Sequence, residues 1–467
     1  MRAFFYLSAV ILIAGCSLQT QNDSTETKLF DEATRTQLVS EFRDAFQKHS
    51  LDPWYPASID SQYGGYLTRF NYQWELEDPQ MKMLVTQARL VWTASHASAF
   101  IDNPEEMVGY ARHGFEFLRD KMWDDEFGGF YTLVDREGNP QPESNGQIIK
   151  QAYGNSFAIY ALAAFAAASG DRQALEMATE TFEWLENHAY DPVYGGYFNY
   201  MERDGTPMKN GFDGTPPKDQ NSSIHILEAF TELYHICPNP MVGVRLAEMM
   251  ELIRDKIRVE PGYLTLFANE DWSPISYRDS TESVRNDNYY FDHVSFGHDV
   301  ETAFLLLEAS EALAIEDDSL TKRIAKQMVD HAIENGWDTV NGGFYDGGYY
   351  LQEGSEMSIV RDTKNWWAQA EGMNSLMMMA KQNPDQSGYY LGYFMKLWEY
   401  VQAYQIDQHH GGWYEWGQDK SPNTAQLPKG HIWKANYHDG RAMMALIRGF
   451  SDGEWSKRPP PNILPCD

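Results

Sequence analysis

The stretch DDEFGGFYTLV, residues 124–134, is one of five copies of a pattern: an aspartate, three further residues, a glycine pair and an aromatic residue. The other copies are DSQYGGYLTRF (60–70), DPVYGGYFNYM (191–201), DTVNGGFYDGG (338–348) and DQHHGGWYEWG (407–417). A glycine pair suits a tight turn with positive φ that leads into a short extended segment. Self-similarity of this kind indicates a repeat architecture.

The spacing of the copies predicts six units. The glycine pairs begin at Gly64, Gly128, Gly195, Gly342 and Gly411, so most steps are about 65 to 70 residues and one is about twice that. A degenerate copy, EPGYLTLF from Glu260, falls in the long gap. Six units of about 70 residues therefore account for most of the 467-residue chain.

Each unit also contains helical and hairpin signals. Apolar residues recur at spacings of three and four in residues 155–170, 223–236, 299–314 and 366–382, which predicts helices. A second turn signal follows the glycine pairs in FYTLVDREGNP (130–140) and YFNYMERDGTP (197–207), as in a β-hairpin. We expect an all-α fold, an (α/α)6 barrel of six helix pairs with short β-hairpin loops at its mouth. An open solenoid is the alternative, but six repeats with apolar inner helices favour closure.

The N-terminus, MRAFFYLSAVILIAGCSLQT, has one basic residue and an apolar run too short to span a membrane, followed by IAGC. It is typical of a bacterial lipoprotein signal, which predicts cleavage before Cys16, lipidation of Cys16 and anchoring to a bacterial membrane facing the periplasm or the cell surface. An ordinary secretory signal with a chance cysteine is the alternative. We divide the chain into a signal peptide (1–15), a flexible tether (16–28), the barrel (29–455) and a C-terminal tail (456–467).

The amino-acid composition limits the kinds of molecule that the protein is expected to bind. A formal charge of −31 argues against nucleic acid and anionic membrane surfaces, which require basic residues, and leaves the lipid anchor as the only expected membrane contact. An aromatic share of 14% suits an uncharged sugar, whose flat faces pack on rings. Cys237 and Cys466 are too few for a disulfide framework, and no cysteine pair suggests a metal.

Polar residues of catalytic type recur near the start of the apolar helices, one set per unit. They are Arg89, Tyr153, Asn221 with His225, His298 with Glu301, Trp366 and Trp367 with Glu371, and Trp433 with His438. Taken singly, a buried histidine is more often a core residue, Arg89 could pair with a structural acid, and the tryptophans could be core. Their shared phase favours convergence on one sugar-binding mouth.

Two readings of the histidines are open. His298 and Glu301 are three residues apart on one helix face, so the carboxylate could orient the imidazole. Three histidines and a glutamate could instead bind zinc, but they lack the close paired-histidine spacing of helical zinc enzymes. We therefore expect no metal.

Four stretches carry a family resemblance: SFGHDVETAFLLLEA (295–309), NWWAQAEGM (365–373), NSSIHILEAFTEL (221–233) and WKANYHDGRAMM (433–444). From about residue 40 to 450 the chain resembles the N-acylglucosamine 2-epimerase superfamily, and within it the cellobiose 2-epimerases. The resemblance implies that His298 and His438 are the acid/base pair, supported by Glu301, and that His225 assists ring opening or proton relay. It also implies that Arg89 holds the oxygens of the opened sugar and that no cofactor is needed. The implied sugar-contacting residues are Tyr153, Asn221, Trp366, Trp367, Glu371 and Trp433.

The chemistry is consistent with these residues. Epimerisation at C2 of an aldose requires ring opening, removal of the C2 proton and its return from the opposite face, and two histidines titrating near neutrality suit it. We therefore expect interconversion of glucose and mannose at the reducing end of a β-1,4-linked disaccharide or oligosaccharide, such as cellobiose or mannobiose.

Three other functions are alternatives. A mannose–fructose isomerase would use the same enediolate. A glycoside hydrolase or lyase on this barrel is a second alternative, and an inverting hydrolase would need two opposed carboxylates. A silent glycan-binding lipoprotein would gain nothing from three histidines. This chain has Gln87 where members of the family that it resembles usually have Asn, Ser223 where they have His, and Ala435-Asn436 where they have Gly-Pro. We expect these positions to affect the choice of substrate.

Overall fold

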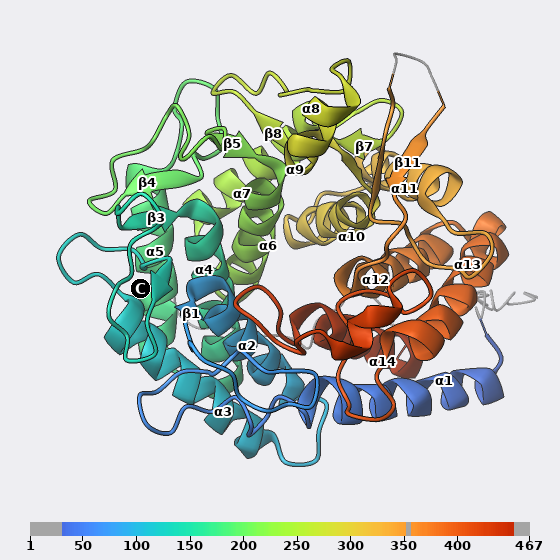
Figure 1. Ribbon diagram of the computed structural model, residues 1–467, viewed down its shortest axis with the longest axis horizontal. Coiled ribbons are helices and arrows are strands. Elements are labelled where there is room, and N and C mark those ends of the chain that lie inside the picture. Colours follow the sequence, from blue (N-terminus) through green and yellow to red (C-terminus); the bar gives the residue numbers. More distant parts are fainter. Residues whose placement is uncertain (1–29, 352–355, 453–467) are drawn as a thin grey trace, which may run out of the picture.

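The computed structural model of the protein describes residues 30–351 and 356–452. Twelve long helices alternate between an inner and an outer ring (Figure 1). The inner helices are α2 (Leu84–Ala97), α4 (Ala152–Ser169), α6 (Gln220–Ile236), α10 (Phe296–Ala312), α12 (Trp366–Gln382) and α14 (Tyr437–Asp452). The outer helices are α1 (Glu32–Ala45), α3 (Pro104–Phe117), α5 (Arg172–His188), α7 (Pro240–Leu252), α11 (Ser319–Gly336) and α13 (Ser387–Tyr400).

The inner ring is closed. Each inner helix contacts the next one along the chain, and α14 returns to contact α2. Figure 1 shows the red C-terminal helix beside the blue N-terminal ones. The predicted (α/α)6 barrel is therefore confirmed, and the open solenoid is not the fold.

Burial distinguishes the two rings. Every residue of α4 from Ala152 to Ala166 is buried, because this helix packs against neighbours on all sides. The outer helix α5 buries only one face and is capped by Asp171, whose carboxylate accepts hydrogen bonds from the backbone N–H groups of Gln173 and Ala174. The apolar inner ring agrees with the sequence analysis, and the outer helices are amphipathic because one face of each meets solvent.

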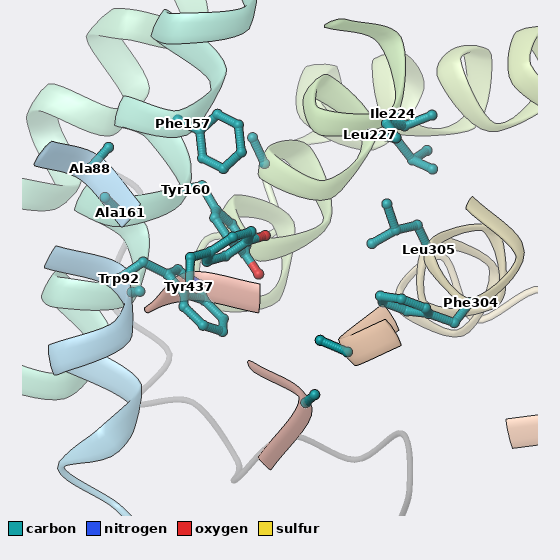
Figure 2. Packing of buried hydrophobic residues seen from close by; sticks show 14 of the residues in the cluster. Ala88, Trp92, Phe157, Tyr160, Ala161, Ile224, Leu227, Phe304, Leu305 and Tyr437 are labelled. Carbon is teal, nitrogen blue, oxygen red and sulfur yellow. The ribbon is translucent and has the colours of Figure 1, made fainter. Parts of the chain in front are cut away.

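An aromatic cluster joins the last inner helix to the first two (Figure 2). Trp92 of α2 stacks on Tyr160 of α4 with ring centroids 5.0 Å apart, and Tyr437 of α14 meets Trp92 edge-on at 5.2 Å. Such pairs add to the free energy that burial of the rings already supplies. Ring closure therefore rests in part on Tyr437, the first residue of the last helix.

Short antiparallel strands connect successive units at the end of the barrel where the inner helices begin, which we call the mouth. The strand before each inner helix pairs with the hairpin of the next unit. The pairs are β1 (Lys82–Met83) with β2 (Leu133–Val134), β3 (Ile149–Gln151) with β4 (Tyr200–Glu202), β5 (Lys218–Asp219) with β8 (Phe267–Ala268), and β9 (Val294–Ser295) with β10 (Gly347–Tyr349). β10 also pairs with β11 (Ser358–Arg361). Single bridges Asn365↔Trp416 and Phe70↔Gly430 complete the circle.

The degenerate sixth copy is a hairpin, as its position predicts. β6 (Arg258–Val259) pairs with β7 (Tyr263–Leu264), and Gly262 between them has φ of 143°. In the five regular copies both glycines of the pair have positive φ, as in Gly128 and Gly129 at 67° and 71°. The short helices α8 (Glu282–Asp287) and α9 (Tyr289–Asp292) follow the sixth copy and were not predicted.

Each regular turn holds a buried ion pair that the sequence analysis did not foresee. The aspartate that opens the turn binds a lysine in the segment that leads into an inner helix, and both side chains are essentially inaccessible. The pairs are Asp60–Lys82, Asp124–Lys150, Asp191–Lys218, Asp338–Lys364 and Asp407–Lys429. Lys218 also donates to the carbonyl of Gly195 at 3.1 Å, so it fastens the turn to the helix entry.

The predicted signal peptide (1–15), the tether with Cys16 (16–28) and the tail (456–467) lie outside the described residues, so the division of the chain remains a prediction there. α1 begins at Glu32 and α14 ends at Asp452, inside the predicted barrel limits. No helix among the described residues is both long and apolar enough to cross a membrane. Cys237, which caps α6, is disulfide-bonded, and the other two cysteines lie outside the described residues.

We expect Lys218→Met to lower the free energy of unfolding by roughly 3–5 kcal/mol, because it leaves Asp191 charged and buried without its partner. Urea denaturation followed by circular dichroism measures this change. Lys48→Met, which removes an exposed pair with Asp44, is the control and should cost less than about 1 kcal/mol. Adding Asp191→Asn to Lys218→Met should recover part of the loss. Equal effects of Lys218→Met and Lys48→Met would contradict a structural role for the buried pair.

Candidate active site

The structure brings most of the predicted site residues into contact at the mouth. Arg89 of α2 donates from Nη2 to the hydroxyl of Tyr153 on α4 at 3.2 Å, and from Nη1 to the carbonyl of Trp433, just before α14, at 3.3 Å. The guanidinium also lies over the ring of Phe157 at 4.5 Å. Arg89 is thus a fixed cation that side-chain and backbone groups of two other units hold in place.

Tyr153 and its neighbours extend this contact to α6. The rings of Tyr153 and Phe157 lie 5.5 and 4.7 Å from the imidazole of His225. Burial raises the pKa of Tyr153, while Arg89 and a hydrogen bond with Asn221 oppose that rise. Asn221 is partly exposed and therefore lies at the surface of this group.

Two of the predicted histidines lie against one indole. The ring of Trp367 is 4.6 Å from the imidazole of His298 and 5.9 Å from that of His438, centroid to centroid. Trp366, its buried neighbour, is 6.2 Å from His438. His298 and Trp367 are partly exposed and Trp433 is 45% exposed, so solvent and a ligand reach this group from the mouth.

The expected pairing of Glu301 with His298 is wrong. His298 Nδ1 lies 2.8 Å from the hydroxyl of Ser295, at the end of the preceding strand. Glu301 instead accepts a hydrogen bond from Arg441 Nη2 at 2.5 Å and lies 4.0 Å from His438. Glu301 contacts Arg441 and not His298, because a buried guanidinium is a stronger hydrogen-bond donor to a carboxylate than a neutral imidazole is.

Two other carboxylates contact histidines. Glu371 Oε1 is 2.6 Å from His438 Nδ1, so Glu371, expected to contact sugar, supports a histidine instead. Glu228 Oε2 is 2.9 Å from His225 Nδ1. Sequence reasoning missed Glu228, although it stands three residues after His225 in the same spacing as His298 and Glu301. In both contacts Nδ1 is engaged and Nε2 remains for a substrate.

Arg441 is the residue that sequence reasoning missed most completely. It lies in the stretch WKANYHDGRAMM, three residues after His438, and its guanidinium contacts Glu228, Glu301 and Glu371. The spacing of three from His438 was a signal that it shares that helix face. Arg441 and the three glutamates are all buried, so the site contains a charged cluster enclosed by the apolar inner helices.

Burial and these charges shift the pKa values of the site. Burial lowers the pKa of His298 to about 3 and, together with Arg89 and Arg441, that of His438 well below its ordinary value. Burial opposes ionisation of Glu228, but Arg441 and the hydrogen bond from His225 outweigh it and lower its pKa to about 2. The His298 and His438 imidazoles are therefore neutral at neutral pH, while the Glu228 carboxylate beside His225 stays ionised.

One group of possible metal ligands occurs among the described residues. Glu301, Glu371 and His438 present ligand atoms within 4.8 Å of one another. Both carboxylates already accept hydrogen bonds from Arg441. The positive charge that a metal ion would bring to this cluster is thus supplied by a fixed guanidinium.

Three of the side chains that the sequence analysis connects with substrate choice contact the scaffold. Gln87 bonds both the backbone N–H and the carbonyl of Tyr66, and the hydroxyl of Ser223 donates to the carbonyl of Asp219. Asn436 is buried and donates to the carbonyl of Ser50. These three side chains therefore support turns and helix entries, which makes them weaker candidates for choosing a substrate than the sequence suggested.

The fold and the site define a class. An (α/α)6 barrel whose mouth carries aromatic rings, an arginine and three histidines is suited to acid/base chemistry on a sugar. The chain matches the N-acylglucosamine 2-epimerase (GlcNAc 2-epimerase) family over residues 65–442 and belongs to that family. The protein is a carbohydrate epimerase and thus an isomerase.

The proteins to which this chain is similar include sugar epimerases and a sugar isomerase. A cellobiose 2-epimerase of Ruminococcus albus is 28% identical over 424 residues, which cover 88% of this chain and 98% of the relative. The solved cellobiose 2-epimerase from Spirochaeta thermophila is 29% identical, with a TM-score of 0.75 over 91% of this chain and 98% of that one. A D-mannose isomerase of Pseudomonas cannabina pv. alisalensis is 23% identical over 343 residues, 72% of this chain and 76% of the relative.

We expect Glu228→Gln to lower the free energy of unfolding by roughly 2–4 kcal/mol at pH 7, because the folded protein depresses the pKa of Glu228 from 4.5 to about 2. A depressed pKa stabilises the fold fully above pH 4.5, and this stabilisation is lost as the pH falls toward 2. The difference between wild type and Glu228→Gln in urea denaturation should therefore shrink from pH 6 to pH 3. Glu176→Gln, in an exposed pair with Arg172, is the control. A difference that grows on acidification would contradict the assignment.

Proposed function

We propose that this protein interconverts glucose and mannose at the reducing end of a β-1,4-linked disaccharide or oligosaccharide, with cellobiose and mannobiose as candidate substrates. The observation that carries the proposal is the placement of His298 and His438 against the same indole of Trp367. Two bases beside one aromatic platform suit a sugar carbon that loses a proton from one face and regains it on the other. The cellobiose 2-epimerases among similar proteins support the choice of substrate.

In this mechanism His225 assists opening of the sugar ring, and the open aldehyde makes the C2 proton acidic. One of His298 and His438 removes that proton, which leaves an enediolate. The other histidine returns a proton to C2 from the opposite face, so an aldose with inverted C2 results and no net proton is consumed. Arg89, held by Tyr153 and the carbonyl of Trp433, stabilises the negative charge on the enediolate oxygens.

The solvent exposure of each tryptophan indicates which sugar of the substrate it is suited to contact. Trp433, the most exposed of the site tryptophans, is suited to stack on the second sugar at the mouth, whereas Trp366 and Trp367 are suited to the reducing-end sugar. Tyr153 and Asn221 offer hydrogen bonds beside it. Glu371 acts through His438, and the reaction draws on no cofactor.

Two alternatives differ in what they require. Aldose–ketose isomerisation of mannose uses the same enediolate but returns the proton to C1, and a D-mannose isomerase is among the similar proteins. Glycoside hydrolysis requires two carboxylates on opposite sides of the bond that breaks. Here Glu301 and Glu371 both bind one nitrogen of Arg441, so they are not opposed across a substrate.

The test is incubation of the purified protein with cellobiose, mannobiose and mannose in deuterated water, followed by NMR. We expect deuterium at C2 of an aldose product, and His438→Ala should lower kcat by about 10²–10⁴. A ketose product would favour the isomerase, and cleaved monosaccharides or no exchange would refute the proposal. His331→Ala is the matched control, since His331 is buried on the outer helix α11 beside Tyr350 and should leave the exchange rate unchanged.

We also propose that the protein is lipid-anchored at Cys16 to a bacterial membrane, facing the periplasm or the cell surface. The lipoprotein-like N-terminus motivates this proposal. The disulfide at Cys237 supports export, because disulfides persist mainly in oxidising compartments.

Export can be tested in bacterial cells that express the full chain. We expect the protein to incorporate labelled fatty acid and to partition into detergent, and Cys16→Ser to abolish both because position 16 then has no thiol for lipidation. Cys237→Ser is the control and should keep the lipid. Secretion without fatty acid in the wild type would instead favour an ordinary secretory signal.

A further inference from the structure

Arg441 is one buried cation among three buried carboxylates. Its Nη1 contacts Glu228 Oε1, and its Nη2 donates to Glu301 Oε1 at 2.5 Å and to Glu371 Oε1 at 2.6 Å. One guanidinium balances one carboxylate, and a buried carboxylate without compensation is costly. The cluster therefore favours the uptake of a further proton.

The place for that proton is the contact between Glu371 and His438. Glu371 Oε1 and His438 Nδ1 are 2.6 Å apart, and one hydrogen lies between them. Burial raises the pKa of Glu371 well above its ordinary value; Arg441 opposes the rise and Glu301 adds to it. The same Oε1 that faces His438 also faces Arg441, so the two side chains compete for one oxygen.

The number of protons on this pair decides what His438 Nε2 can do. With one proton, held on Nδ1, Glu371 is ionised and Nε2 has a free lone pair, so it is a base. When Nε2 takes a proton from carbon, the Nδ1 proton can pass to Glu371, and no buried imidazolium persists. The pair then holds two protons and Nε2 is an acid. Nothing is gained or lost other than the proton that moves.

We propose that Arg441 is a positioning residue that holds Glu371 against His438 and sets how readily this pair accepts its second proton, with Glu301 acting in the opposite sense. The positive charge of Arg441 favours the one-proton state, in which Nε2 is a base, and the negative charge of Glu301 favours the two-proton state. The catalytic use of the pair rests on the proposed epimerase function, whereas its titration does not.

The other charged and titratable groups that act on His438 or Arg441 lie on four inner helices. They are Arg89 on α2, His225 and Glu228 on α6, His298 and Glu308 on α10, and Tyr437 on α14. Arg441 also fixes Glu228, which contacts His225 Nδ1 at 2.9 Å. A single cation therefore supports two histidines of the site.

The experiment follows the ¹⁵N shift of His438 Nε2 with pH in the full-length protein labelled at histidine, with the signal assigned from His438→Ala. We expect the midpoint to move to higher pH in Arg441→Met, because loss of the cation favours the second proton, and to lower pH in Glu301→Gln. Arg441→Lys keeps the charge and should restore the midpoint most of the way. Unchanged midpoints, or shifts of the same sign in Arg441→Met and Glu301→Gln, would overturn the proposal.

Because Arg441→Met leaves three buried carboxylates without the cation that they share, it can fail to fold, and Arg441→Lys and Glu301→Gln keep the test decisive in that case. Arg245→Met is the matched control. Arg245 on the outer helix α7 likewise binds two glutamates, Glu186 at 2.7 Å and Glu248 at 2.9 Å, away from the site. It should lower stability and leave the Nε2 midpoint in place.

The acid limb of kcat against pH, measured by deuterium exchange at C2 of cellobiose, should move with the Nε2 midpoint in each variant, with kcat changing more than KM. Shifted midpoints without any exchange in the wild type would refute the epimerase function and leave the role of Arg441 intact. Deuterium exchange at C2 by the wild type, together with Nε2 midpoints that do not move in the variants, would refute the role of Arg441 and leave the epimerase function intact.

Discussion

The buried lysine–aspartate pair in each glycine turn is the interaction on which the barrel depends. The aspartate ties the turn together, since its side chain also accepts backbone N–H groups within the turn, as Asp191 does from Val193. The lysine comes from the segment just before an inner helix. Each pair therefore fixes a helix entry relative to the preceding outer helix. A charged pair without water requires near-ideal geometry, which penalises any other register.

The fixed entries explain where the chemistry lies. A helix entry presents its first side chains toward the mouth, and closure of the ring brings six entries together. Arg89 and Trp433 lie more than 340 residues apart in sequence, yet the guanidinium donates to the tryptophan carbonyl because α14 returns to α2. The Tyr437 ring that closes the barrel against Trp92 also places His438, its neighbour in sequence, beside Trp366 and Trp367.

The repeat made the fold predictable, because glycine pairs with positive φ and apolar helical periods are local signals. The positions of His225, His298 and His438 near helix starts followed from the same phase. The partner of each histidine did not follow, because side chains on different inner helices meet only after closure: Glu371 and His438 are 67 residues apart, and Glu228 and Arg441 are 213 apart. The aspartate–lysine pairs were missed for a similar reason, since a lysine about 25 residues after a turn has no local signature.

Two histidine–glutamate motifs with the same i, i+3 spacing have different partners in the structure, because one arginine, Arg441, binds both glutamates. His225 with Glu228 and His298 with Glu301 have the same spacing on neighbouring inner helices, and sequence alone gives no reason to treat them differently. Glu228 has one oxygen for His225 and the other for Arg441, so it serves both partners. Glu301 binds Arg441, and His298 takes the hydroxyl of Ser295. His298 therefore lies beside an uncharged hydroxyl, whereas His438 lies in a charged network. Two bases with such different surroundings can hold protons of different affinity at one pH, which is what removal of a proton by one base and delivery by the other requires.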